Sequence, residues 1–357
     1  MTDKDLTKQT QLSALRISLM YFSVLMGAGF ASGKEMWQFF GVFGFKGFFG
    51  IILIAFFFIS LGFVIVSNAH NLGTGDLSKI IFPFDHLIFE NIVAVIVGAF
   101  LFLAYFSMLA AGGALIQEQF GIHRVIGSFT LMCLVFFTAF RGFGRVSSNL
   151  GKIVPILLIA TLIMAVLIIG KDFKNISGTQ VITASPLAPN WLIAAIVFVS
   201  YNIMGAIPIL GSCAIHSTKG VTVKKGAVLG GVFLGSCALI LYLVTLTDPM
   251  LSQNSPLPML SLSLKISRIV GVVYCGVLLI SIFGTAVSCF YGFSTKLPNG
   301  PKKHRLLVFS AIAGFGCSLL GFSNIVAILY PIEGYLGLVI IMLMIWNYIR
   351  IKGGKRI

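Results

Sequence analysis

The sequence Leu25-Met26-Gly27-Ala28-Gly29-Phe30-Ala31-Ser32-Gly33 lies in the middle of the first long apolar segment of the chain. Each of its three glycines destabilises a helix by about 1 kcal/mol relative to alanine. Within a bilayer, non-helical backbone is tolerated only where it is buried in protein or lines a cavity. The stretch therefore predicts an interrupted helix with free backbone groups facing a cavity. The alternative is close helix packing on small residues.

The same pattern of residues recurs in the second half of the chain. Met26-Gly27-Ala28 is followed by Gly33, and Met204-Gly205-Ala206 is followed by Gly211, with identical spacing. The two methionines are 178 residues apart in a chain of 357. Pro208 lies inside the second copy and predicts an interruption there as well. Matching broken segments in the two halves of a membrane protein point to the binding site of a transporter.

The composition is that of a helical integral membrane protein. The chain is 58% hydrophobic and 10% charged, with a mean hydropathy of +1.03. Long apolar segments dominate, and the alternating pattern of a transmembrane β-barrel is absent. Its six cysteines form no CxxC pair and are expected to be small packing residues. We therefore expect an all-α fold embedded in the lipid bilayer.

Ten apolar segments each have about the 20 residues that a helix needs to cross a bilayer. Their approximate limits are 13–41, 47–69, 88–115, 124–140, 148–170, 190–211, 224–246, 266–294, 306–321 and 324–348. Five spans per half is an odd number, so the second half enters the membrane from the opposite side. We expect one domain, 1–357, built as a 5+5 inverted repeat of 13–170 and 190–348, with helices 1 and 6 interrupted.

The basic residues are distributed unevenly between the two sides of these spans. With the amino end inside, 18 of the 25 lysines and arginines fall in cytoplasmic segments and 7 in outer ones. This bias predicts a multi-pass protein of the cell membrane with both termini in the cytoplasm. The net charge of +15 then reflects topology and attraction to anionic lipid, and no nucleic-acid partner is expected.

The run from Gly27 to Glu35, G-A-G-F-A-S-G-K-E, resembles the YkvI-type family of bacterial membrane proteins. Its first four residues also resemble the glycine-rich break of amino-acid permeases. The family is placed in the amino acid–polyamine–organocation superfamily, which has the LeuT-type fold of five plus five inverted spans. The resemblance covers the layout of nearly the whole chain and specific motifs in spans 1, 6 and 8. It implies a secondary active transporter of a small organic solute, an amino acid or related amine, driven by sodium or protons.

The resemblance also implies where the solute binds. In the fold, half-helix amino ends at the break face a substrate carboxylate. The matching positions in this chain are Gly27, Ala28, Gly29, Phe30, Tyr105, Phe198, Tyr201, Asn202 and Gly205. Phe198 matches an aromatic lid and Tyr105 matches a tyrosine of span 3. The alternative for Tyr105 is a ring packed in the core with its hydroxyl satisfied.

The resemblance implies a cation site as well. In sodium-coupled relatives one ion lies between carbonyls of span 1 and hydroxyls of span 8. The matching residues are Ser23, Met26, Thr285 and Ser288. Thr285 and Ser288 are three apart, hence on one helix face, although both hydroxyls could instead bond back to their own helix. Span 5 lacks the lysine of many proton-coupled relatives, which favours sodium and leaves the ion open; no other cofactor is expected.

Charged residues inside spans are candidates for function. Lys34 and Glu35 follow the break in span 1, and Glu333 lies in the outer half of span 10. In the fold, a basic residue of span 1 and an acidic residue of span 10 can form a thin outer gate, which predicts a Lys34–Glu333 pair. The alternative is that Lys34 extends to the interface and pairs locally with Glu35.

Other classes of function have weaker support. Gly73-Thr74-Gly75-Asp76 matches the GxGD motif of intramembrane aspartyl proteases, but it lies in an expected loop and no span carries a partner aspartate. No HExxH, nucleotide-binding loop or channel filter motif is present, so an enzyme, a pump or a channel is not expected. The main alternative is a receptor of the same fold that binds a nutrient without moving it. The sequence indicates neither the substrate nor the oligomeric state.

Overall fold

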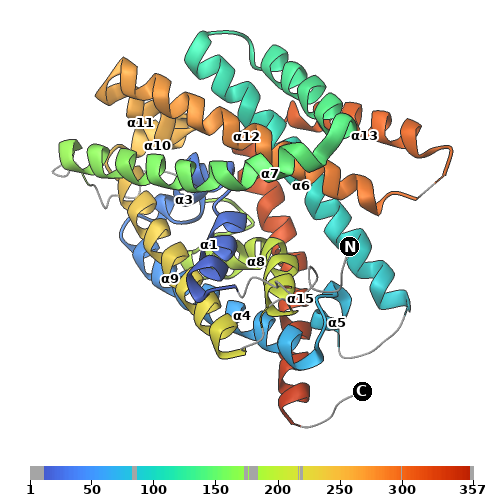
Figure 1. Ribbon diagram of the computed structural model, residues 1–357. Coiled ribbons are helices and arrows are strands. Elements are labelled where there is room, and N and C mark those ends of the chain that lie inside the picture. The colour runs from blue at the N-terminus through green and yellow to red at the C-terminus, as the bar shows by residue number, and fades with distance from the viewer. Residues whose placement is uncertain are drawn as a thin grey trace.

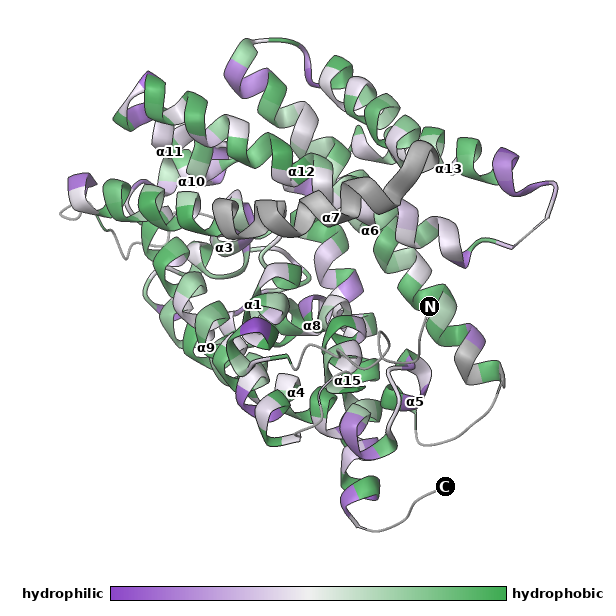
Figure 2. Cartoon of the chain, viewed as in Figure 1, coloured by the Kyte–Doolittle hydropathy of each residue, from purple (hydrophilic) through white to green (hydrophobic). Residues whose placement is uncertain are grey.

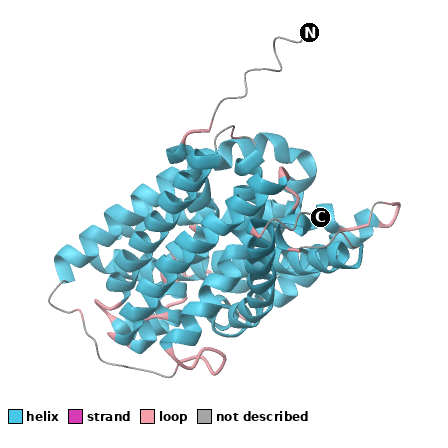
Figure 3. Cartoon of the chain, turned by 90° about the horizontal axis from the view of Figure 1, so that it is seen from below, coloured by secondary structure: helices cyan, strands magenta, loops and turns pink. Residues whose placement is uncertain are grey.

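The computed structural model describes residues 12–82, 87–172, 176, 184–215, 217, 220–298 and 300–353, without the side chains at 28, 87, 89, 90 and 140–157. Within these residues every regular element is a helix and no strand occurs (Figure 3). The all-helical class predicted from composition is confirmed.

In chain order, the helices of the described residues are α1 (Ala14–Leu25), α2 (Ala28–Ala31), α3 (Lys34–Phe39), η1 (Gly41–Phe43), α4 (Lys46–Leu72), α5 (Leu77–Ile81), α6 (Leu87–Phe120), α7 (Arg124–Asp172), α8 (Trp191–Ile215), α9 (Gly220–Thr245), α10 (Pro249–Asn254), α11 (Pro258–Ile266), α12 (Arg268–Lys296), α13 (Lys303–Ser318), α14 (Phe322–Asn324), the π-helical turn η3 (Ile325–Leu329) and α15 (Tyr330–Lys352).

Six helices in the described residues are long and apolar enough to cross a bilayer. They are α4, Asn91–Phe120 of α6, α8, α9, α12 and Phe322–Lys352. Apolar residues run along their lengths, and hydrophilic ones gather toward many of the helix ends (Figure 2). Large apolar side chains also lie on the surface; Ile269 is 76% exposed and Val95 is 71% exposed. Lipid covers such side chains, whereas a soluble monomer rarely exposes contiguous apolar patches of this kind.

The long helices form two groups, one above the other in Figure 1. In the first group, α4 packs on α8 and α9, and α1 packs on the same two helices. In the second group, α6 packs on α7, α12 and α13. Glycines allow the close approach: a Cβ on Gly231 of α9 would meet the backbone of Ile59 at 2.7 Å. In lipid, this close packing of small residues is a main attraction between helices.

The first span is interrupted at the glycine-rich stretch, as predicted. α1 ends at Leu25, and α2 begins after Met26 and Gly27. The chain turns again at Gly33, whose φ of 79° is a left-handed conformation that glycine adopts without steric cost. The Ser32 hydroxyl, which donates to the Gly29 carbonyl at 2.6 Å, pairs one backbone group freed by this turn.

The prediction that the sixth span is interrupted is wrong. α8 is a continuous helix from Trp191 to Ile215, with Gly205 and Pro208 inside it. A proline removes a single hydrogen bond, in this helix the one to the carbonyl of Met204, and the turns on either side keep theirs. Neighbouring helices can hold such a segment helical in a membrane. α8 lies against α4 and α15, which provide that support.

The prediction of separate fourth and fifth helices is also wrong. α7 is one helix of 49 residues that continues through 141–147, where the sequence predicted a connection. That segment contains two glycines but no proline, so nothing in it forces the helix to end. A straight helix of this length is about 74 Å long, more than twice the roughly 30 Å of a hydrocarbon core. This helix is therefore longer than a single crossing needs.

Two buried asparagines hold the short helix α5 against the long helices. Asn347 Nδ2, on α15, donates to the carbonyls of Lys79 and Ile80 at 2.9 and 3.1 Å. Asn68 Nδ2, on α4, donates to the same Ile80 carbonyl at 3.2 Å. These carbonyls lie at the end of α5, where no helical donor remains for them.

We expect Asn347→Leu to lower the free energy of unfolding by about 1–3 kcal/mol, because buried carbonyls lose their donor. The measurement is the melting temperature in detergent. Asn324→Leu is the matched control, since Asn324 is exposed and donates only to the Leu320 carbonyl one turn back. Equal melting temperatures for the two variants would contradict the proposed role of Asn347.

Candidate functional site

A cavity of about 440 Å³ lies between the two groups of helices. The first group contributes α1, the glycine break and α8 to its wall, and the second contributes α6 and α12. Eight residues proposed from the sequence line it: Ser23, Met26, Gly27, Tyr201, Asn202, Gly205, Thr285 and Ser288. The volume lies within the range of small-molecule sites. The structure thus brings predicted residues of spans 1, 6 and 8 around one space.

The two sides of this cavity present different chemistry. At the break, the backbone of Gly27 faces the cavity outside any helix. On α8 the backbone is helical, so Gly205 contributes space and no free amide. A Cβ built on Gly205 would have Phe100 as its nearest neighbour, at 3.7 Å. The polar groups that α8 offers are the side chains of Tyr201 and Asn202.

Four predicted solute residues lie outside the cavity wall. Phe30 and Phe198 are buried in an aromatic cluster, with ring centroids 6.2 Å apart, and Tyr201 joins the cluster at 5.4 Å from Phe198. Tyr105 stacks on Phe290 at 4.7 Å. The fourth is Gly29, which lies against Glu35. The side chain of Ala28 falls outside the described part of the chain.

The ring of Tyr105 is packed in the core, as the alternative interpretation predicted. Its hydroxyl has no hydrogen-bond partner, which that interpretation did not predict. The side chain is fully buried, and its ring occupies the place that a Cβ on Gly314 would need. Its hydroxyl is buried without a hydrogen-bond partner. The cavity wall next to it is formed by Ala104.

The hydroxyls predicted to bind a cation are available. Thr285 and Ser288 line the cavity, and neither has a hydrogen-bond partner among the described residues. Farther along α12, Ser294 and Thr295 donate to carbonyls three residues back, at 2.6 and 2.7 Å. The alternative in which both cavity hydroxyls bond back to their own helix is therefore not what the structure has.

The predicted Lys34–Glu333 ion pair does not form. Lys34 Nζ donates instead to three backbone carbonyls, those of Ser252 at 3.3 Å, Gln253 at 2.8 Å and Ser255 at 2.9 Å. These carbonyls lie at the carboxyl end of α10, where helical donors run out. An ammonium group has three donors, and this turn satisfies all of them. A distant loop, which sequence spacing does not reveal, is therefore the partner.

The segment from α10 to α11 covers the part of the first span that follows the glycine break, and we call residues 249–266 the lid. Trp37 Nε1 donates to Gln253 Oε1 at 2.6 Å, and the Met259 amide donates to the Ser32 carbonyl at 2.9 Å. With the three bonds of Lys34, these contacts join the lid to the broken segment. These hydrogen bonds fix the lid to the residues that follow the glycine break.

Carboxylates hold the lid from its other side. Glu118 Oε1, on α6, accepts from the hydroxyls of Ser255 and Ser261, both at 2.6 Å. At the exposed edge, Lys265 pairs with Asp248 at 3.0 Å. This hydrogen bond raises the pKa of the Lys265 ammonium. An exposed pair of this kind contributes little to stability, so the buried contacts of Lys34 and Glu118 dominate.

Glu35 is hydrogen-bonded to a residue of the cavity wall. Its Oε2 accepts from the Tyr201 hydroxyl at 2.7 Å, and a Cβ on Gly29 would overlap its Oε1. The local Lys34–Glu35 pair is therefore also absent. The sequence identified Glu35 only as a charge beside Lys34; its position in a buried span was the available signal of function.

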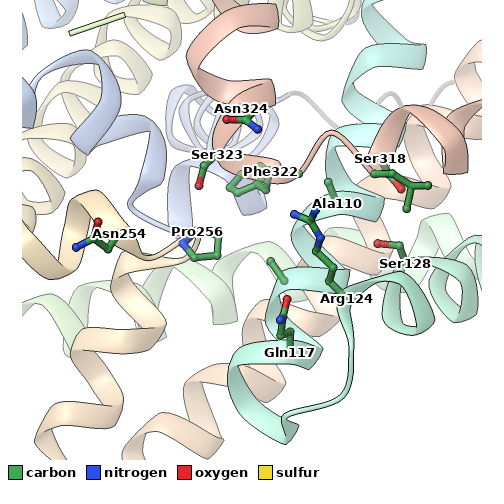
Figure 4. A pocket seen from close by; sticks show the side chains of 13 residues that line it. Ala110, Gln117, Arg124, Ser128, Asn254, Pro256, Ser318, Phe322, Ser323 and Asn324 are labelled. Atoms are coloured by element: carbon green, nitrogen blue, oxygen red, sulfur yellow. The ribbon is translucent and has the colours of Figure 1, made fainter. Parts of the chain in front are cut away.

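A second cavity, of about 210 Å³, lies on the lid side of the molecule. Figure 4 shows Arg124 reaching into it from the start of α7, with Gln117, Asn254 and Ser323 around it. None of the residues proposed from the sequence lines this space. It is polar and separate from the cavity at the glycine break.

Comparison with known proteins places this geometry in a class. The fold is the membrane transporter fold of the LeuT and Mhp1 type. The inward-facing structure of Mhp1 matches with a TM-score of 0.62 and 14% identity, covering 95% of this chain and 77% of Mhp1. A closed, bromovinylhydantoin-bound structure of Mhp1, a nucleobase-cation-symport-1 family transporter, matches at 0.53 and 10% identity, covering 94% and 74%. A manganese transporter of Eremococcus coleocola matches at 0.53 and 12% identity, covering 99% and 88%.

Two Bacillus subtilis (strain 168) proteins are similar over nearly the whole chain. The uncharacterized membrane protein YkvI is 27% identical over 345 residues, 94% of this chain and 96% of YkvI. The uncharacterized protein YyaD is 26% identical over 353 residues, covering 93% and 96%. No family model matches the chain.

We expect Lys34→Met to speed amide hydrogen exchange in the lid, because three buried hydrogen bonds from the ammonium are lost while the chain length is kept. The measurement is hydrogen–deuterium exchange by mass spectrometry on protein in detergent. Lys46→Met is the control, since Lys46 is exposed at the start of α4. Unchanged exchange in 249–266 would show that Lys34 does not hold the lid.

Proposed function

We propose that the protein is a secondary active transporter of a small organic solute, an amino acid or a related amine, in the cell membrane. The observation that carries the proposal is the cavity at the glycine break, where residues from spans 1, 6 and 8 meet between two helix groups. A site at such a boundary can be exposed to each side in turn when the groups move against each other. On this proposal, α1, α4, α8 and α9 rock against α6, α7, α12 and α13.

The helix contacts support a 5+5 inverted repeat within one transmembrane domain. If spans 1 to 5 repeat as 6 to 10, the contact of span 1 with span 7 should have a counterpart between spans 6 and 2. Both occur, as α1 on α9 and α8 on α4. Spans 3 and 9 and spans 8 and 4 form a second such pair, as α6 on α13 and α12 on the first part of α7, where the Phe136 and Phe290 rings lie 6.3 Å apart. The bias of basic residues supports cytoplasmic termini.

The proposed solute site uses the break for one end of the solute and α8 for the other. Amides beside Gly27 suit a carboxylate, and Tyr201 and Asn202 provide polar side chains. Val24, Leu25, Phe100 and Ile280 form an apolar wall for the remainder. The buried aromatic cluster of Phe30 and Phe198 separates this site from the lid side.

The coupling ion in this proposal is sodium or a proton. The free hydroxyls of Thr285 and Ser288, with the Met26 carbonyl and Ser23, suit sodium. A non-transporting nutrient receptor of the same fold is the second candidate function. Its specific support is the absence of a break in α8, which leaves irregular backbone on only one side of the cavity wall in the described residues.

Uptake into proteoliposomes distinguishes a transporter from a non-transporting receptor. A thermal-shift screen of purified protein against amino acids and amines first identifies a ligand, since a ligand stabilises the state that it binds. We then expect saturable accumulation of that labelled ligand under an inward ion gradient. Binding without accumulation would establish the receptor. Running both assays in sodium and in potassium, at several pH values, assigns the coupling ion.

We expect Gly205→Leu to reduce uptake roughly tenfold or more, the equivalent of about 1.4 kcal/mol, because the larger side chain fills the cavity. Gly205→Ala should transport normally, since its Cβ has no neighbour closer than 3.7 Å. Gly276→Leu is the matched control on α12, where an added Cβ meets nothing within 4 Å. Full uptake by Gly205→Leu would place the solute elsewhere.

A further inference from the structure

Two glutamates are buried close to the cavity without a cationic partner. Glu35 is 5% exposed and Glu333 is 9% exposed. In the described part of the chain, neither carboxyl forms an ion pair. Lys34, the nearest lysine in sequence, is bonded to the lid carbonyls. Glu333 Oε1 is buried and has no hydrogen-bond partner.

The two carboxyls belong to one cluster. Glu333 lies one turn after Tyr330 near the start of α15, and the Tyr330 ring packs 5.0 Å from the ring of Tyr201, whose hydroxyl donates to Glu35. The position of a Cβ on Gly29 would overlap Glu35 Oε1 and lie 3.7 Å from the Tyr330 hydroxyl. The other elements around them contribute Tyr201 from α8 and Cys289 from α12 as titratable groups. None of these is a base that carries positive charge.

Burial makes two unneutralised carboxylates unfavourable. A single carboxylate without a partner costs several kcal/mol when removed from water, and two neighbouring ones also repel each other. The hydrogen bond from Tyr201 stabilises Glu35, but no such bond reaches Glu333 Oε1. The remaining way to reduce the charge of the cluster with the groups at hand is a proton on one of the two carboxyls.

We propose that the buried cluster of Glu35 and Glu333 holds a proton, at a site that is connected to the cavity through Tyr201. The Tyr201 hydroxyl is bonded to Glu35 Oε2, and its residue also lines the cavity wall. A proton enters when this hydroxyl passes its hydrogen to Glu35 and accepts another from hydronium in the cavity. On the other side, Tyr330 shares a hydrogen bond of 2.7 Å with Ser107, which closes the cluster.

This site gives the proposed transporter a coupling ion. Gly29 and Glu35 lie on either side of the turn at Gly33 and contact each other. A change in the charge of Glu35 therefore acts directly on the broken part of the first span. Protonation favours the conformation of this structure, with the carboxyl packed on Gly29. Loss of the proton would leave a charge at this place and favour its exposure to water. The assignment to coupling rests on the proposed function, whereas the proton site itself does not.

The test is infrared difference spectroscopy of the purified, ligand-free protein in lipid nanodiscs during a pH titration. We expect a carbonyl band of a protonated carboxyl group at neutral pH that shifts in deuterium oxide. Glu35→Gln and Glu333→Gln should each alter or remove this band. Tyr201→Phe should move it to higher frequency, because the carbonyl loses a hydrogen-bond donor. Glu118→Gln is the matched control; Glu118 is a half-buried glutamate on α6 that accepts two serine hydroxyls.

Several results would overturn the site. These are the absence of a protonated carboxyl band at neutral pH, a band unaffected by both glutamine variants, and a band removed by sodium, which would identify a metal cation as the occupant. Melting temperatures of the variants show that each is folded. Because no solute is used, a band with these properties alongside failed uptake would refute transport and leave the proton site intact. Uptake without the band would do the reverse.

Discussion

The need to pair every backbone N–H and C=O inside a bilayer determines how this protein is built. A helix satisfies that need by itself, so any break needs other donors and acceptors. The break after Leu25 is supplied with them: Ser32 bonds to Gly29, and the lid bonds to Ser32 through the Met259 amide. The lid is thus part of the first span's hydrogen bonding. The irregular backbone of the first span therefore depends on a loop more than 200 residues later for one of its hydrogen bonds.

The same constraint explains the position of Lys34. Its ammonium would be costly in a low-dielectric interior, and the carboxyl end of α10 has carbonyls that lack donors. The ammonium of Lys34 donates to these carbonyls, so both groups are satisfied and Glu333 is left without a cationic partner. A direct Lys34–Glu333 pair would neutralise two charges but leave those carbonyls buried without partners. The structure therefore separates the positive group, fixed to the lid, from the negative groups, which remain near the cavity.

Sequence reasoning located the part of the fold that depends on local composition. Glycines in a first apolar span, and hydroxyls three residues apart on a later one, identified the break and much of the cavity wall. It failed where tertiary contacts decide. Pro208 does not interrupt α8, because adjacent turns and neighbouring helices compensate for one lost hydrogen bond. The carbonyls that bind Lys34 come from a loop whose position no spacing predicts, and Tyr105 faces the core although Ala104 reaches the cavity.

Because α8 is unbroken, the two halves of the chain contribute different kinds of groups to the cavity wall. In a symmetric arrangement both halves would offer free backbone, and a zwitterion could be held from either side. In this chain only the first half does, and α8 contributes side chains instead. One of those, Tyr201, is hydrogen-bonded to the carboxylate that rests on the broken segment. The continuous helix α8 therefore carries the side chain that contacts the broken first span. The Tyr201–Glu35 hydrogen bond connects the cavity wall to the buried carboxyl beside the break.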